Sequence, residues 1–183
     1  MKRNIRVLCD VDGVLCNYAG GALSVIEEVT GRPPPDGILN EWDIFRQFGP
    51  EEREEIFKAF EKEGWCYSLE VLPGALQGIR NLRKAGADIY FVTAPWHSPH
   101  WAYERTKWLC DYFEADKKHV VHAHAKYLCV GDVFIDDKIG HVQTWQDHHP
   151  LGVGILWEAP YNGSIPYPIR SSSWDFVLSV VTR

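Results

Sequence analysis

Short apolar runs recur along the chain, with longer stretches of mixed character between them. Several of the runs are four to six residues long, which suits strands that are buried on both faces, as in a parallel sheet. Between the runs, apolar residues recur every three or four positions, which is the helical spacing. The pattern therefore predicts an α/β fold with a parallel sheet. The expected strands are 5–9, 88–92, 132–135 and 152–157, with a shorter one at Val120–Val121.

Capping residues delimit the helical segments. Asn17 can cap a helix over 18–30, because its side chain can accept from the first free N–H groups. Pro50 suits the first turn of a second helix, which is rich in acids near its start and is expected to continue to Glu63. The remaining helices are expected at 76–84, from the Ser98–Pro99 pair to Phe113, and after Ser172 or Ser173.

Two pairs of acids stand where apolar runs end. Asp10 and Asp12 follow the first run, and Gly13 after them allows a sharp turn with positive φ. The pair Asp136–Asp137 ends the run 132–135. Ligands of open α/β sheets bind outside the carboxyl ends of the strands, so these acids could share one site. The alternatives are an Asp-rich turn that caps the next helix and a solvated acidic turn.

The segment Asp10–Leu15, DxDG followed by an apolar pair, resembles the first motif of the haloacid-dehalogenase-like (HAD) phosphohydrolases. Three further parts of that family's pattern follow in order: Thr93 at the end of a strand, Lys126 before another strand, and the acidic pair Asp136–Asp137. The resemblance implies a Rossmann-like, three-layer α/β core with a parallel sheet. It also implies a small, largely helical cap inserted after the first motif. The expected parts are a core of residues 1–16 and 69–183 and a cap of residues 17–68.

Within that superfamily the chain resembles the 5'(3')-deoxyribonucleotidases over nearly its whole length. The resemblance rests on segments 64–76, Thr93–Pro95, Tyr103–Arg105 with Trp108, the spacing from Lys126 to Asp136, Thr144–Trp145 and Ser173–Trp174.

Three positions depart from that family's pattern. Ala94 stands where the family usually has Ser, Arg105 stands where it has a lysine, and the cap pair Trp42–Asp43 has an acid where animal members have an apolar residue. The first departure leaves phosphate binding in place, because the backbone N–H remains. The third puts the base preference in question.

The resemblance assigns roles to most of these residues. It implies that Asp10 attacks phosphorus and that Asp12 is the acid and base. Phosphate oxygens are expected to bind the hydroxyl of Thr93, the N–H groups of Val11, Asp12 and Ala94, and the cations Lys126 and Arg105. For Arg105, which shares a helical stripe with Trp101, Trp108 and Tyr112, the surface alternative is a snorkelling side chain.

The charges by themselves require a cation. Four aspartates bring up to four negative charges together, and a phosphate monoester adds roughly −1.5 to −2 at neutral pH. Hard oxygen ligands beside a phosphate point to Mg2+. The resemblance implies that Asp10, Asp12 through its carbonyl, Asp136 and Asp137 place this metal, with Asp136 slightly favoured as the direct ligand and Asp137 behind it.

Aromatic residues beside the substrate positions that the family resemblance implies suggest a pocket for a nucleobase. Tyr18, Trp42 and Trp96 are the candidates, and the alternative is plain packing of the cap. His119, His122 and His124 alternate, which would place them on one strand face. A zinc site is the alternative there, but it would need a fourth ligand, so we interpret them as ordinary polar positions.

Composition narrows the classes of function. The 183 residues are 45% hydrophobic and 24% charged, which suits one globular domain with a small insertion. A net charge of −6 gives no basic footprint for long nucleic acid, and neither a signal peptide nor a membrane span is expected. Five scattered cysteines suggest reduced thiols in a cytoplasmic protein, and a homodimer is left open.

The combined expectation is a Mg2+-dependent phosphatase that hydrolyses (deoxy)nucleoside monophosphates to nucleoside and phosphate through an aspartyl-phosphate. Two alternatives stay open at this point. One is a HAD phosphatase for another small phosphate ester, and the other is a pseudoenzyme that binds nucleotide without turnover.

Overall fold

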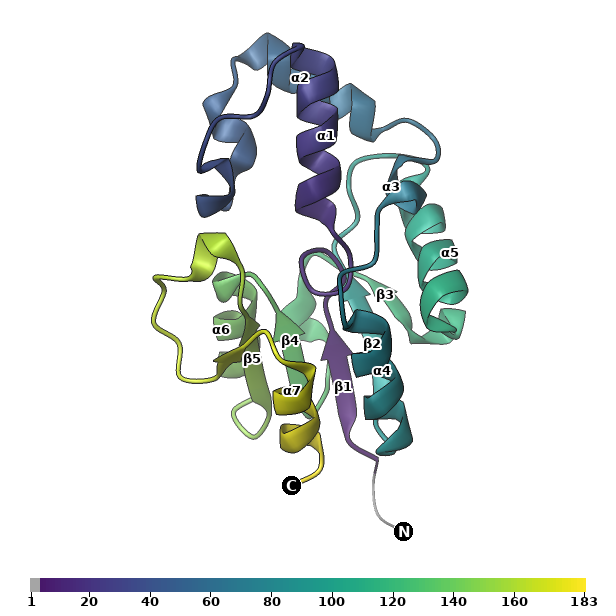
Figure 1. Ribbon diagram of the computed structural model, residues 1–183. Helices are drawn as coiled ribbons and strands as arrows, with labels where there is room; N and C mark the ends of the chain where they lie inside the picture. The colour runs from purple at the N-terminus through teal and green to yellow at the C-terminus, as the bar shows by residue number, and fades with distance from the viewer. Residues whose placement is uncertain (1–3) are drawn as a thin grey trace.

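The computed structural model describes residues 4–183 and contains a six-stranded parallel sheet (Figure 1). The strands lie in the order β3-β2-β1-β4-β5-β6, so the strand that precedes the first acids is central. The expected strands are confirmed to within about a residue, and β6 was not expected. Their bounds are β1 Arg6–Cys9, β2 Asp88–Thr93, β3 Val120–His122, β4 Val133–Asp136, β5 Val153–Trp157 and β6 Arg170–Ser171.

Helices cover both faces of the sheet, as the predicted α/β fold requires. Successive side chains of a strand point to opposite faces, so Val7 and Cys9 join one apolar cluster while Leu8 joins the other. In Figure 1, α4 and α7 lie in front of the sheet and α6 lies behind it. The first cluster is covered by α4 (Ala75–Lys84), α5 (Trp101–Phe113) and α7 (Trp174–Val181), and the second by α6 (Ile139–His148).

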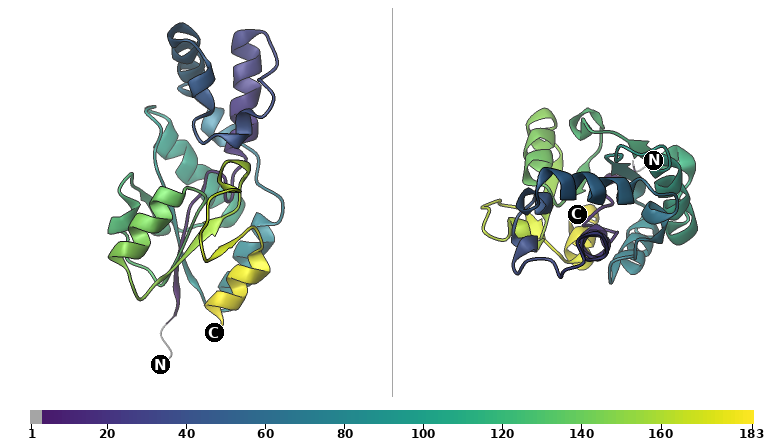
Figure 2. Two further views of the ribbon diagram at one scale, coloured as in Figure 1. Left: turned by 90° about the vertical axis from the view of Figure 1, so that its left-hand side faces the viewer. Right: turned by 90° about the horizontal axis from the view of Figure 1, so that it is seen from above.

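The segment from α1 to α3, which follows the first motif and is called the cap segment below, rises above the carboxyl ends of the strands (Figures 1 and 2). Its helices α1 and α2 pack against each other and enclose an apolar cluster separate from the two at the sheet, with Ile26 and Ile56 fully buried in it. Its elements are α1 Tyr18–Thr30, η1 Ile38–Asn40, η2 Ile44–Gln47, α2 Pro50–Phe60 and α3 Trp65–Ser68. The cap boundaries at residues 17 and 68 stay a prediction.

Two predicted helix ends are wrong. The helix that begins at Pro50 ends at Phe60, not at Glu63. Residues five apart on a helix point about 140° away from each other, yet the rings of Phe60 and Trp65 lie 4.3 Å apart. This contact requires the chain to turn back, and it does so at Gly64, whose φ is +89°.

The second wrong helix end is at the start of α5, which begins at Trp101 rather than at Pro99. Ser98 caps a tight turn there instead of the helix, because its Oγ accepts from the N–H of His100 at 3.2 Å. Across residues 4–183 we find no helix with the length and apolarity needed to span a bilayer.

Candidate active site

Neighbouring strands bring the two acidic motifs together. The ends of β1 and β4 are in register, with Cys9 beside Ile135, and the N–H of Asp10 donates to the carbonyl of Ile135 at 2.9 Å. The next residues, Asp10 and Asp136, therefore meet at one edge of the sheet. Oxygens of Asp10, Asp136 and Asp137 all lie within 4.8 Å of one another, and all three residues are buried.

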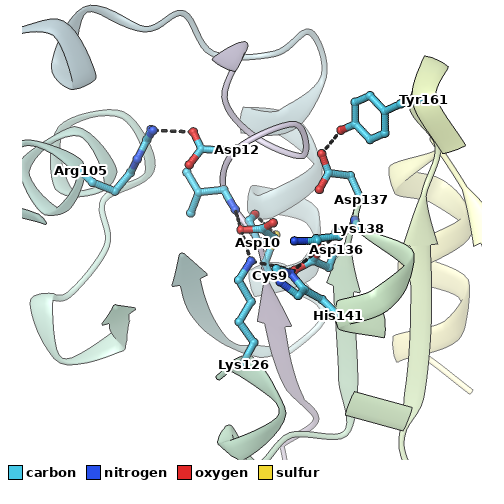
Figure 3. Close-up of polar contacts among 11 residues, drawn as sticks. Cys9, Asp10, Asp12, Arg105, Lys126, Asp136, Asp137, Lys138, His141 and Tyr161 are labelled. Carbon is cyan, nitrogen blue, oxygen red and sulfur yellow. Dashed lines mark hydrogen bonds and ion pairs between the residues drawn. The ribbon is translucent and has the colours of Figure 1, made fainter. Parts of the chain in front are cut away.

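Lys126 supplies the positive charge between two of these carboxylates. Its Nζ lies 2.7 Å from Asp10 Oδ1 and 2.7 Å from Asp136 Oδ2, and the residue is 3% exposed (Figure 3). Burial lowers the pKa of the Lys126 ammonium, but the two carboxylates outweigh it, so the pKa lies above its ordinary value. Lys126 is therefore charged at neutral pH and holds the side chain of Asp10 in place.

The two acids of the second pair have different surroundings. Asp136 has both oxygens engaged, by Lys126, by the N–H of Lys138 at 2.9 Å and by His141 Nδ1 at 3.1 Å. Burial raises the pKa of Asp136, but Lys126 and His141 lower it by more, so that the pKa falls to about 2. Asp137 Oδ1 is buried and has no hydrogen-bond partner among residues 4–183. Burial, followed by the charge of Asp136, raises the pKa of Asp137 to about 7.

These surroundings fit a divalent cation. One lysine cannot balance three buried carboxylates, and burial together with Asp136 also raises the pKa of Asp10 well above its ordinary value. A hard cation among oxygen ligands would remove that imbalance, and the unpartnered oxygen of Asp137 is available to bind it. The structure brings together three of the four residues predicted to bind a metal, Asp10, Asp136 and Asp137. The carbonyl of Asp12, expected as a further metal ligand, stays a prediction.

Asp12 forms an ion pair with Arg105 that the sequence did not predict. Its Oδ1 lies 2.5 Å from Nη2 of Arg105 on α5, and Arg105 is 0% exposed. The guanidinium also lies between two indoles, 5.2 Å from the ring centre of Trp101 and 5.3 Å from that of Trp108. The snorkelling surface alternative for Arg105 is therefore wrong. The predicted contact of Arg105 with phosphate stays a prediction. One N–H group of its guanidinium is already engaged by Asp12.

Two of the residues predicted to bind phosphate, Val11 and Lys126, contact Asp10, and Thr93 ends the neighbouring strand β2. Thr93 is fully buried, and within the described part of the chain its Oγ1 has no hydrogen-bond partner, so the hydroxyl can donate to a bound group. The N–H of Val11 donates to Asp10 Oδ1 at 2.7 Å, which differs from the phosphate contact that was expected. Gly13 has φ +79°, and a Cβ there would collide with the carboxylate of Asp137. The predicted turn with positive φ at Gly13 is therefore confirmed.

A cavity of about 480 Å³ opens above Asp12 and Asp137, between the sheet edge and the cap segment. The three predicted pocket residues all line it, and Trp42 is 50% exposed at its margin. Trp96 also packs against Phe57 of the cap, with ring centres 5.2 Å apart. The lining includes Tyr18, Trp42 and Phe45 from the cap segment and Ala94, Trp96, His124 and Tyr161 from the rest.

Several residues at the site were not predicted. Tyr161 donates to Asp137 Oδ2, and Asn162, 1% exposed, donates through Nδ2 to the carbonyl of Asp137 at 2.8 Å. His141 supports Asp136 from α6. The pair Tyr161–Asn162 soon after a predicted strand was the one local signal in this part of the sequence. The contacts of these two residues with Asp137 depend on packing between β4 and the chain after β5.

The three alternating histidines do not share a strand face, so that expectation is wrong. Only His122 lies in β3, because the strand begins at Val120, after a 3-10 turn that ends at His119. His119 lies 3.6 Å from Asp88, His122 Nε2 lies 2.9 Å from Thr106 Oγ1, and His124 lines the cavity. Each histidine therefore has its own surroundings, which agrees with the interpretation as separate polar positions.

The model of a known family, described as "5' nucleotidase, deoxy (Pyrimidine), cytosolic type C protein", matches residues 3–183. The chain belongs to this 5' nucleotidase family. A human cytosolic-type 5'(3')-deoxyribonucleotidase is 25% identical over 189 residues, covering 96% of this chain and 92% of that protein. The human mitochondrial 5'(3')-deoxyribonucleotidase is 28% identical over 186 residues, covering 94% and 79%. The expected hydrolase of the nucleotidase type is confirmed.

Solved structures show the same fold at low identity. A HAD-like hydrolase of Streptococcus pneumoniae superposes on this 5' nucleotidase family member with a TM-score of 0.65 at 12% identity, covering 97% of this chain and 98% of that one. A HAD hydrolase of Bacillus subtilis that is bound to magnesium gives a TM-score of 0.61 at 14% identity over the full length of both chains. The predicted HAD-type α/β fold is confirmed.

Proposed function

We propose that this protein is a Mg2+-dependent phosphatase that hydrolyses (deoxy)nucleoside monophosphates to nucleoside and phosphate. The observation that carries the proposal is the buried pair of Asp10 and Lys126 at 2.7 Å, set beside two further aspartates below a cavity of about 480 Å³. A cavity of this size suits a small, largely enclosed ligand. The proposed partner is therefore a mononucleotide, and neither long nucleic acid nor a membrane.

Asp10, Asp137 and the carbonyl of Asp12 would hold the Mg2+, which would supply charge neutralisation for the phosphate oxygens. The free oxygen of Asp137 supports it as the direct carboxylate ligand in place of the Asp136 we favoured from sequence, because both oxygens of Asp136 are already engaged. Asp136 would then orient Lys126. Outer partners of this kind orient the ligands that they touch.

The reaction would proceed in two displacements. A carboxylate oxygen of Asp10 attacks phosphorus while the bond to the ester oxygen breaks, which gives an aspartyl-phosphate. Asp12 gives its proton to the leaving oxygen and releases the nucleoside. Asp12 then takes a proton from a water whose oxygen attacks phosphorus, and inorganic phosphate leaves with Asp10 restored.

The chain's own donors would hold the phosphate during both steps. The hydroxyl of Thr93 is the best placed of them, because Thr93 ends β2, the strand beside β1, and its hydroxyl is buried with no competing acceptor among residues 4–183. The backbone N–H of Ala94 and the ammonium of Lys126 would also donate to phosphate oxygens. The N–H of Val11 would join when its carboxylate partner turns toward phosphorus. Such fixed donors stabilise charge that develops during reaction without reorganising.

We infer that Arg105 positions Asp12 for proton transfer. Arg105→Met should lower kcat for an alkyl phosphate by up to about 10²-fold, within the range of general acid catalysis, and should lower kcat for a good aryl leaving group much less. A good leaving group needs less help from an acid. Measuring kcat on both substrates, with Arg105→Lys as the control that keeps the charge, tests the role. Equal losses on the two substrates would show that Arg105 only stabilises the fold.

We propose that Trp42 contacts the nucleobase. At saturating Mg2+, Trp42→Ala should raise KM for nucleoside monophosphates by about 5- to 150-fold, because stacking of a base on an aromatic side chain contributes about 1–3 kcal/mol. A small aryl phosphate does not reach the margin of the cavity, so its kcat/KM should change far less. Comparing kcat/KM on the two substrates is the measurement. Similar losses on both would mean that Trp42 serves packing alone.

A phosphate-release screen tests the function as a whole. Purified protein is assayed on deoxy- and ribonucleoside monophosphates, with 5' and 3' phosphates, and on sugar phosphates, each with and without Mg2+. We expect the highest kcat/KM on nucleoside monophosphates, and only with the metal. A clear preference for sugar phosphates would refute the nucleotide assignment, and absence of turnover on every substrate would favour the pseudoenzyme.

We also propose a cytoplasmic location, because all five cysteines are free thiols. Burial raises the pKa of Cys66 well above its ordinary value, so that thiol is protonated and unreactive at neutral pH. A homodimer stays a prediction.

A further inference from the structure

The loop that contains η5 (Pro160–Asn162) lies between the acidic residues and the cap segment. On the side of the acids, Tyr161 donates its hydroxyl to Asp137 Oδ2 (Figure 3). Asn162 fixes the backbone of the same residue, since its Nδ2 donates to the carbonyls of Asp137 and Trp157, both at 2.8 Å. The loop therefore holds Asp137 by its side chain and by its main chain.

On the other side, the same loop touches the cap. The ring of Tyr161 meets the indole of Trp42 edge to face, with centres 5.1 Å apart and planes at 86°. The ammonium of Lys138 lies 4.8 Å from the centre of that indole, and the N–H of Lys138 donates to Asp136 Oδ1. One exposed side chain of the cap thus contacts the residues that support both acids of the second pair.

The hydroxyl of Tyr161 is not needed for packing against Trp42, because a phenyl ring would make the same edge-to-face contact. That hydroxyl donates to the buried carboxylate of Asp137. The bond engages Oδ2, while Oδ1 of Asp137 has no partner in residues 4–183. The geometry therefore presents one oxygen of Asp137 to a ligand and fixes the other.

We propose that Tyr161 is a positioning residue that couples docking of the cap to cation binding at Asp137. The proposal rests on the proposed Mg2+-dependent function. While Trp42 is docked, the ring of Tyr161 is held, and its hydroxyl keeps Asp137 oriented for the metal. When the cap departs, Tyr161 loses that contact and Asp137 loses its orientation. By thermodynamic linkage, a bound cation then favours the docked cap to the same degree.

Tyr161→Phe tests the positioning role, because it removes the hydroxyl and keeps the ring. The dissociation constant for Mg2+, measured by calorimetry without substrate, should rise about 10- to 100-fold, the range found when an outer partner of a metal ligand is removed. The Mg2+ concentration for half-maximal activity should rise in parallel, while kcat at saturating Mg2+ should fall much less. Tyr167→Phe, in the same stretch of chain but packed on the α6 side of the sheet, is the matched control and should bind Mg2+ normally.

The coupling to the cap is tested by adding Trp42→Ala. In the wild-type background Trp42→Ala should weaken Mg2+ binding, and in the Tyr161→Phe background it should weaken it clearly less, because both changes act on one hydrogen bond. Equal Mg2+ affinity of wild type and Tyr161→Phe would overturn the proposal while leaving the function intact. Strictly additive losses would overturn the coupling. A wild-type protein that binds no Mg2+ would overturn both this proposal and the proposed function.

Discussion

Asp10→Asn is expected to lower kcat on nucleoside monophosphates by about 10⁴- to 10⁶-fold, the scale seen when a nucleophile is removed from a catalytic unit. The amide keeps the shape of the side chain but has no charged oxygen to attack phosphorus. It also cannot form the ion pair with Lys126, whose Nζ lies 2.7 Å from Asp10 Oδ1. Phosphate release from freshly purified variant, together with a mass measurement for a covalent phosphoryl group, gives the result.

Asp12→Asn is the informative companion to that variant. It should be nearly inactive on an alkyl phosphate, yet it should still accumulate phosphorylated protein slowly from an aryl phosphate, because the first displacement needs little acid when the leaving group is good. Asp10→Asn should accumulate none. Substantial turnover by Asp10→Asn, free of wild-type protein, would contradict the nucleophile assignment. Turnover of the alkyl phosphate by Asp12→Asn at the wild-type rate would contradict the acid role.

Removal of divalent metal is expected to abolish activity, and added Mg2+ should restore it. The physical reason is the charge at the site, where oxygens of three buried carboxylates lie within 4.8 Å and Lys126 pairs with two of them, Asp10 and Asp136. Without a cation, the phosphate would approach like charges in a cleft of low dielectric. Ca2+ should inhibit, because its larger and looser coordination can engage both oxygens of Asp10.

The metal experiment has a direct control. Chelated protein is assayed before and after Mg2+ is returned in excess over the chelator, and its melting temperature is measured in both states. Recovery of activity with an unfolding transition present in both states separates a functional metal from loss of the fold. Full activity in excess chelator would contradict the proposed use of metal by Asp10 and Asp137.

The sequence by itself determined the sheet and the position of the chemistry along it. The long strands could be predicted because a strand buried on both faces must be apolar throughout, and that pattern is local. Asp10, Thr93 and Asp136 could be placed at one edge because each ends or follows such a strand, and parallel strands end on the same side. The resemblance then gave roles to residues whose positions the strands had already fixed.

Only the tertiary structure decided which groups hold the acids. Arg105 lies 93 positions from Asp12 in sequence, and its helix covers a face of the sheet, so nothing local reveals that the two side chains meet. The same holds for Tyr161 and Asp137, which are 24 positions apart. Asp136 and Asp137 are identical and adjacent in sequence. They differ because a turn before β4 and helix α6 place Lys126 and His141 beside Asp136, while the chain after β5 places Tyr161 beside Asp137. Long-range packing therefore sets the partners of each buried charge.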